Sequence, residues 1–145
     1  MTGPDFIANA GKPSAAPRFH LGVDDVLASL VEVSERGCAL FDHAVFATLA
    51  ALHAQFGISI DLYLFLDASV DGQPRSLRDV SDAVRVDLGR APWLRLGPHG
   101  LDYDHPPYRQ TPEQQQATFA GIYREIDRLV GPARRSKLVR LHDFS

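Results

Sequence analysis

The sequence predicts an α/β fold in which about four strands alternate with helices and form a parallel sheet. Strand-like apolar segments alternate along the chain with segments whose apolar residues recur at helical spacing. Residues 58–66 end as a continuous apolar run, which is typical of a strand covered by helices on both faces. The length of 145 residues fits one domain with a substantial core. Such alternation implies right-handed crossovers between neighbouring parallel strands.

Four short segments have the composition of strands. They are residues 18–23, 58–66, 93–97 and 137–141. The first runs directly into the pair Asp24-Asp25, and the last lies close to the end of the chain. We expect these strands to lie in one sheet, with the intervening helices packed against it.

Glycines and capping residues predict where the first two helices begin and end. An amphipathic stretch from Val26 to about Glu35 is followed by Gly37, a residue that favours a helix C-terminus. Asp42 is the expected N-cap of a second helix over residues 43–56, which Gly57 would end.

Two further helices follow the second strand. Residues 67–74 read as a turn-rich loop, after which Ser76 is the expected cap of a helix that Pro92 breaks. The strongest helix start is Thr111-Pro112-Glu113-Gln114, where Thr111 and Gln114 form a capping box. An apolar face then continues to Gly131.

The composition argues against several classes of function. The net charge of −3 disfavours general binding to nucleic acid or to an anionic membrane, and no apolar run approaches the ~20 residues of a membrane span. The single cysteine, Cys38, points to a reducing compartment, with the cytoplasm as the expected location. Residues 1–17, rich in Gly, Ala and Pro, read as a flexible arm before a domain of residues 18–145.

Candidate functional residues cluster at the predicted C-terminal ends of the strands, where parallel α/β sheets bind ligands. They are carboxylates, imidazoles and one guanidinium, a set that suits a hard or borderline divalent metal. The candidates are Asp24, Asp25, His99, Asp104, His105, Arg140 and His142. We expect Asp24, Asp25, His99, Arg140 and His142 to converge at one end of the sheet.

Each candidate also has a structural interpretation. Asp24 and Asp25 precede a helix, so either could cap it instead of taking part in chemistry. His99 lies in Gly97-Pro98-His99-Gly100, which suits a fixed ligand and equally a tight turn with an exposed imidazole. Read singly, His105 and His142 fit a solvated loop and the interior of the sheet.

Several short motifs resemble those of the polysaccharide deacetylase superfamily, in particular a divergent bacterial branch of its (β/α)-barrel fold. Residues 19–25, Phe-His-Leu-Gly-Val-Asp-Asp, resemble its first motif, a strand that ends in an Asp-Asp pair. His99 follows the third strand, where the superfamily has a His-Ser/Thr-x-x-His metal motif, and residues 140–144 stand where it has Arg-x-Pro-Tyr. Leu52-His53 resembles a further feature of the branch. The resemblance spans residues 18–144 and implies a partial (β/α) barrel.

The resemblance also implies a chemistry. It implies a metal-dependent hydrolase that removes N- or O-acetyl groups from a carbohydrate or another small acetylated substrate. Asp24 would be the general base, Asp25 and His99 would bind a divalent metal, expected to be zinc, and Arg140 would orient the base. In this mechanism the metal polarises the carbonyl and binds the attacking water, whose proton the aspartate accepts.

The chain departs from the family pattern at two positions. Tyr103 stands where the second metal-binding histidine is expected, with Asp104 and His105 as nearby substitutes. His142 stands in place of the proline of the third motif. The sequence also stops before the family's last motifs, which include a general-acid histidine, so we expect little turnover by this chain alone.

A second hypothesis is a non-catalytic half-barrel that binds a carbohydrate or a partner protein, or a fragment of a larger barrel. Unpaired edges at the first and fourth strands would favour pairing with another chain, and we expect a homodimer through these edges.

Overall fold

The protein is described over residues 20–142 by a computed structural model. Its main sheet is parallel and consists of β1 (Leu21–Val23), β2 (Ile60–Phe65) and β5 (Leu94–Gly100), in the order β1-β2-β5. The α/β class and the parallel strands are therefore confirmed, and the described residues form no closed barrel. The predicted arm over residues 1–17 lies outside the described residues, as do residues 18–19 and 143–145.

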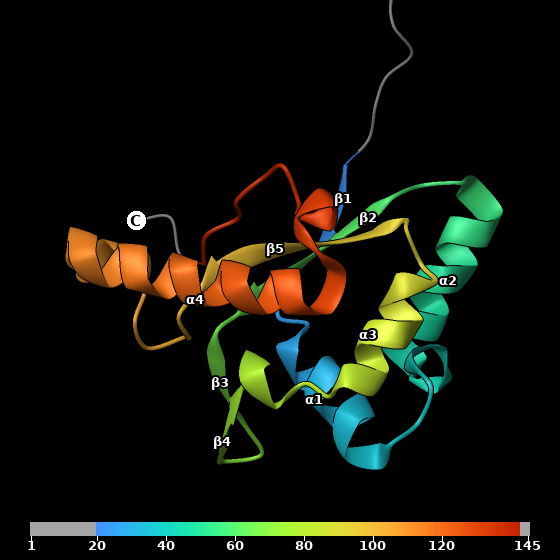
Figure 1. The fold of residues 1–145 in the computed structure, drawn as a ribbon, viewed down its shortest axis with the longest axis horizontal. Helices are drawn as coiled ribbons and strands as arrows, with labels where there is room; N and C mark the ends of the chain where they lie inside the picture. The colour runs from blue at the N-terminus through green and yellow to red at the C-terminus, as the bar shows by residue number, and fades with distance from the viewer. Residues whose placement is uncertain (1–19, 143–145) are drawn as a thin grey trace, which may run out of the picture.

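Within residues 20–142, four α-helices flank the sheet (Figure 1). They are α1 (Leu27–Arg36), α2 (Ala44–Phe56), α3 (Asp82–Gly89) and α4 (Pro112–Val130). Short 3-10 helices occupy Leu40–Asp42, Leu77–Asp79, Pro107–Arg109 and Pro132–Arg134. Apolar side chains of the helices join those of the strands in one core, among them Leu30, Phe46, Ile60, Leu62, Leu88, Leu94 and Ile126. This burial is the main favourable contribution to the fold.

Most predicted helix ends are confirmed. Gly37 and Gly57 follow α1 and α2 in the left-handed conformation, and Thr111 and Gln114 form the expected capping box on α4. The prediction of Asp42 as the cap of α2 is wrong. Asp42 lies in a 3-10 turn, and the Nδ1 atom of His43 instead accepts a hydrogen bond from the amide of Val45 at 3.3 Å.

The predicted loop over residues 67–74 is wrong, because this segment forms a hairpin of β3 (Asp67–Val70) and β4 (Gln73–Ser76). Its two-residue turn is Asp71-Gly72, and both residues have positive φ. Asp-Gly is a strong signal for such a turn, since few other pairs tolerate that backbone. Ser76 then caps the short 3-10 helix, and α3 begins only at Asp82.

The predicted fourth strand, residues 137–141, does not form, although the chain does run beside β5. In this C-terminal segment (residues 136–142), the amide of Ser136 donates to the carbonyl of Leu96 at 2.7 Å. Farther along, the amide of Arg140 donates to the carbonyl of Pro98 at 3.4 Å. Between these two hydrogen bonds the segment has more residues than β5. The segment therefore bulges, and no regular ladder can form.

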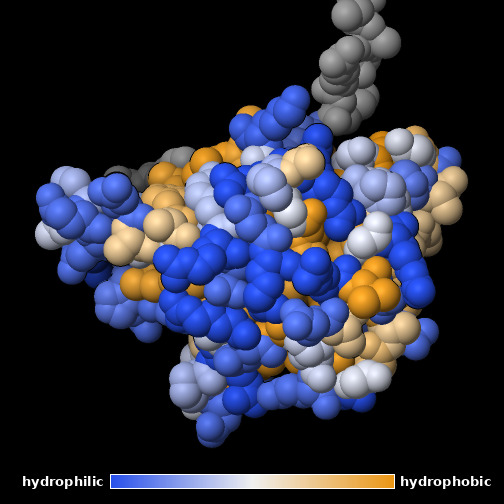
Figure 2. All heavy atoms as spheres, viewed as in Figure 1, coloured by the Kyte–Doolittle hydropathy of each residue, from blue (hydrophilic) through white to orange (hydrophobic). Residues whose placement is uncertain are grey.

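The two faces of the sheet are covered differently. On the face opposite the helices, the ring of Tyr63 lies over Gly22 and Gly97, where a Cβ atom would come within 2.7 and 2.9 Å of ring carbons. The C-terminal segment follows β5 on the side away from α1 and α3 (Figure 1). Figure 2 shows the molecule from the side on which α4 lies in front of the sheet; hydrophilic side chains dominate this surface and hydrophobic residues form separate groups. The C-terminal segment therefore runs along the outer edge of β5, next to the polar face, which is the face that bears Asp61, Tyr63 and Gly97.

Candidate functional site

The chain leaves β1 through Asp24 and Asp25 without capping the following helix. The N-cap of α1 is Val26, and no side chain makes a capping hydrogen bond there. Asp25 has φ of 59°, a left-handed conformation that aspartate tolerates better than most residues. The capping alternative is therefore not realised, and both carboxylates are free to serve another purpose.

His99 is a buried residue of β5, with 3% of its surface exposed. Its Nδ1 atom lies 2.7 Å from the carbonyl oxygen of Arg140. A carbonyl oxygen only accepts hydrogen bonds, so Nδ1 carries a proton. In a neutral imidazole this leaves a lone pair on Nε2, which lies 3.4 Å from Oδ1 of Asp25. Metal-binding histidines are commonly held in this way by a backbone carbonyl.

His142 completes a group of three potential ligands, the metal cluster (Asp25, His99 and His142). One ligand atom of each residue lies within 4.8 Å of the others. The amide of His142 donates to the carbonyl of His99 at 3.0 Å, and the two rings meet edge to face with centroids 5.3 Å apart. Two imidazoles and one carboxylate match a catalytic zinc site with three protein ligands and one open position.

Arg140 connects the remaining aspartate to this cluster. Its Nε atom lies 3.2 Å from Oδ2 of Asp24, so the guanidinium can hold that carboxylate in a fixed orientation. The other oxygen of Asp24, Oδ1, is buried and has no hydrogen-bond partner among residues 20–142. Such an atom is costly unless something donates to it, and a bound water can do so.

Two aromatic side chains form one wall of the site. The ring of Phe65 contacts those of His99 and Tyr103, with centroids 4.8 and 4.6 Å apart. Tyr103 also packs edge to face on His142 at 5.1 Å. Burial raises the pKa of Tyr103, and the negative charge of Asp25 and a hydrogen bond to it raise it further. The phenol therefore stays protonated at neutral pH and can donate a hydrogen bond.

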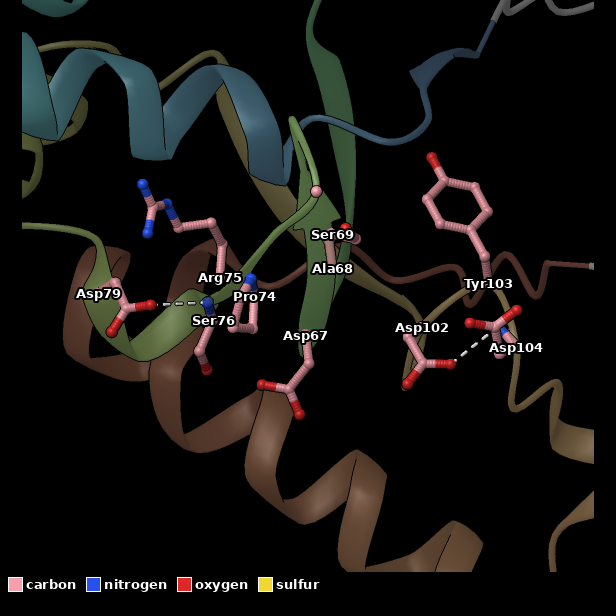
Figure 3. Close-up of a pocket in the computed structure, with 11 residues that line it drawn as sticks. Asp67, Ala68, Ser69, Pro74, Arg75, Ser76, Asp79, Asp102, Tyr103 and Asp104 are labelled. Atoms are coloured by element: carbon pink, nitrogen blue, oxygen red, sulfur yellow. Dashed lines mark hydrogen bonds between the residues drawn. The ribbon is translucent and has the colours of Figure 1, made fainter.

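An open cleft of about 620 Å³ extends from Tyr103 along the β3–β4 hairpin (Figure 3). Tyr103 and Asp104 lie on one side of it, and Arg75 and Asp79 lie on the other. Several of its carboxylates already have partners: Asp79 accepts from the amide of Ser76, and Asp67 lies 3.6 Å from Arg78. The cleft offers room for a polar molecule next to the metal cluster.

The structure brings together six of the residues singled out in the sequence, whereas Asp104, His105 and His53 lie outside this group. The residues that meet are Asp24, Asp25, His99, Tyr103, Arg140 and His142. Asp104 lines the cleft, and His105 pairs with Asp102 at 2.8 Å. His53 has a structural position, since its Nδ1 atom lies 2.7 Å from the carbonyl of Ile58 and its ring stacks on Trp93.

Sequence reasoning missed Phe65, the wall residue. Its signal is nevertheless present, because Phe65 stands near the end of the apolar strand β2, at the same sheet edge as His99. His142 is also more important than its place in the sequence indicates, because its role depends on its spatial neighbour His99.

Comparisons with known proteins add no family assignment. No family model matches the chain, and searches of curated proteins and of solved structures find no significant match. Among the described residues, no helix combines the length and apolar character required to cross a membrane.

Proposed function

We propose that the protein is a metal-dependent hydrolase that removes an acyl group, such as an acetyl group, from a small polar substrate. The observation that carries the proposal is the metal cluster, with Asp24 held beside it by Arg140. The same arrangement supports the resemblance to polysaccharide deacetylases, because the Asp-Asp pair and His99 occupy the expected strand ends. In this proposal the C-terminal segment stands in for the fourth strand of a partial (β/α) barrel.

The three residues of the cluster fit a divalent cation, with zinc as the expected ion. Oδ1 of Asp25 and the lone pair on Nε2 of His99 face each other at 3.4 Å, which is unfavourable for two acceptors unless a cation or a proton lies between them. Zinc–nitrogen and zinc–oxygen bonds of ~2.0–2.2 Å can span this gap. When bound, zinc would act as a Lewis acid toward a carbonyl oxygen and lower the pKa of a bound water.

The remaining residues have separate tasks in the proposed reaction. Asp24 accepts a proton from the attacking water through its unpartnered Oδ1 and passes it to the departing alcohol or amine as the acyl bond breaks and the acid is released, while Arg140 orients the carboxylate. Tyr103, whose hydroxyl hydrogen-bonds Asp25 in this structure, can donate instead to negative charge that develops on the substrate oxygen once Asp25 binds the metal. The cleft beside Tyr103 accommodates the rest of the substrate, for which a carbohydrate is the first candidate. Cys38 is free and suits a reducing compartment such as the cytoplasm.

A second candidate function is a non-catalytic binding domain in which His99 is protonated and forms an ion pair with Asp25. The separation of 3.4 Å is compatible with such a pair. Calorimetric titration with zinc separates the two hypotheses. The hydrolase proposal requires one zinc ion per wild-type chain and greatly weakened binding by His99→Ala and His142→Ala.

His53→Ala is the matched control, because His53 is a half-buried histidine outside the cluster. This variant should bind zinc like the wild type. Equal zinc binding by all four proteins, or by none of them, would overturn the metal site and with it the proposed hydrolase.

A further inference from the structure

A buried carboxylate lies on the polar face of the sheet, outside the metal cluster. Asp61 of β2 has only 1% of its surface exposed. One of its oxygens lies 2.5 Å from Nε of Arg95, and the other accepts a hydrogen bond from Oγ of Ser136 at 2.6 Å. A buried charge is tolerated only when it is paired and hydrogen-bonded, so both partners are needed.

Ser136 is the point at which the C-terminal segment joins the sheet. Its amide donates to the carbonyl of Leu96 at 2.7 Å, while its hydroxyl donates to Asp61. The same hydroxyl accepts a hydrogen bond from the amide of Leu138 at 3.1 Å. Ser136 is 7% exposed, and these bonds hold it on three sides.

The next attachment of the segment is at the metal cluster itself. The carbonyl of Arg140 accepts from His99, and the amide of His142 donates to the carbonyl of His99. Between the two attachments, Leu138 and Val139 are half exposed, so burial contributes little to holding the segment there. The position of Arg140 and His142 therefore depends on hydrogen bonds at both ends of the segment.

We propose that Asp61 and Ser136 are positioning residues that hold the C-terminal segment so that His142 and Arg140 reach the metal cluster. This inference rests on the proposed function, because it assigns His142 as a metal ligand. The two events are coupled in both directions. If docking of the segment favours zinc binding by His142, bound zinc favours docking by the same free energy. Loss of a group that orients a metal ligand typically lowers metal affinity by ~10–100-fold.

Ser136→Ala tests the proposal, with Ser34→Ala as its matched control. Like Ser136, Ser34 donates one hydrogen bond through its hydroxyl and accepts one from an amide, but its acceptor is the carbonyl of Leu30, its donor is the amide of Ser81, and it lies on α1 away from the segment. Ser136→Ala should weaken zinc binding by ~10-fold or more, whereas Ser34→Ala should leave it unchanged. Circular dichroism of the metal-free proteins shows whether each variant folds.

Trypsin cleavage after Lys137 gives a readout that does not depend on metal affinity, because Lys137 lies in the exposed part of the segment. In metal-free protein, Ser136→Ala should be cut there faster than the wild type or Ser34→Ala. Zinc should slow this cut in the wild type but not in His142→Ala. If the wild type binds no zinc, the proposed function fails, while faster cutting of Ser136→Ala would still support the anchoring role.

A milder pair of variants covers the case in which Ser136→Ala does not fold. Leu138→Pro removes the amide N–H that donates to the hydroxyl of Ser136, whereas Leu138→Ala keeps this hydrogen bond. The position is half exposed, so little packing is lost in either variant. Because trypsin does not cleave a Lys-Pro bond, cutting in this pair is followed after Arg140, which is also exposed. Only the proline variant should be cut faster there and bind zinc more weakly. Wild-type cutting and wild-type zinc affinity in Leu138→Pro, and in Ser136→Ala if it folds, would overturn the proposal.

Discussion

The carbonyl oxygen of Arg140 accepts a hydrogen bond from Nδ1 of His99 at 2.7 Å, across 41 residues of sequence. This bond places the proton of a neutral His99 on Nδ1, so that Nε2 faces Asp25. The side chain of the same arginine lies 3.2 Å from Asp24. One residue therefore orients both the proposed base and a proposed metal ligand, and the first two predictions depend on this arrangement.

The first prediction concerns Asp25. Two substitutions distinguish the effect of its charge from the effect of its left-handed backbone conformation. Asn tolerates the left-handed φ of 59° about as well as Asp, whereas Ala does not. Asp25→Asn should weaken zinc binding strongly with little change in thermal stability, and Asp25→Ala should lose zinc binding and also melt at a lower temperature. Zinc titration and thermal unfolding of the metal-free variants measure the two effects. Undiminished zinc binding by Asp25→Asn would remove Asp25 from the cluster.

The second prediction concerns Asp24 as the base. Asp24→Asn should lower the already low kcat expected of this chain for hydrolysis of an acetylated sugar by a further ~10²–10⁴-fold, because an amide cannot accept the proton from water. Zinc content should stay at the wild-type level, since Asp24 lies outside the metal cluster. Asp42→Asn, at an exposed aspartate of the Leu40–Asp42 turn outside the cluster and the cleft, is the control and should retain activity. Acetate release with full zinc loading checks this, and wild-type turnover by Asp24→Asn would exclude it as the base.

A third prediction follows from the tight packing of Tyr63 and Ser136 against Gly97. A Cβ atom there would lie 2.9 Å from both the ring of Tyr63 and Cβ of Ser136. Gly97→Ala should therefore destabilise the protein by ~1–3 kcal/mol, the usual cost of overpacking. Gly89→Ala is the control, because a Cβ atom at that position would have no neighbour within 4 Å among the described residues. Urea unfolding of both variants gives the comparison, and equal stabilities would contradict the tight packing.

The fourth prediction is a pH dependence of stability. A hydrogen bond and ion pair with Arg135 hold the pKa of Asp127 below its ordinary value of 3.8. A lowered pKa in the folded state gives a stabilisation that is present above the ordinary pKa and is lost as the pH falls through the folded value. The wild type should therefore melt above Asp127→Asn at pH 7, and the difference should vanish well below pH 3.8. A difference that persists or grows in acid would contradict this pairing.

A fifth prediction concerns self-association. β1 pairs with β2 on one side only, and its other edge has no strand partner within residues 20–142. The outer edge of β5 is partly covered by the C-terminal segment. We therefore expect a homodimer joined through β1, and Val23→Pro should weaken it, because proline removes a backbone donor and disfavours pairing of an edge. Sedimentation velocity measures the change, and a wild-type monomer at high concentration would contradict the expectation.

Local patterns in the sequence were sufficient to predict the α/β class, the ends of α1 and α2, and the capping box on α4. These features depend on residues that are neighbours along the chain, such as Gly37, Gly57 and the pair Thr111 and Gln114. The expectation that Asp25 and His99 would meet also follows from simple geometry, because parallel strands end at the same edge of a sheet. The Asp71-Gly72 pair is an equally local signal for a hairpin turn, although residues 67–74 were predicted to form a loop.

Only the tertiary structure decided what surrounds those residues. His142 joins His99 because the C-terminal segment bulges beside β5, and the size of that bulge depends on where Ser136 can reach Asp61. No local pattern encodes such a distance, since it results from the packing of segments far apart in the sequence. The sequence by itself therefore determined which side chains stand at the strand ends, and long-range packing decided which of them share one site.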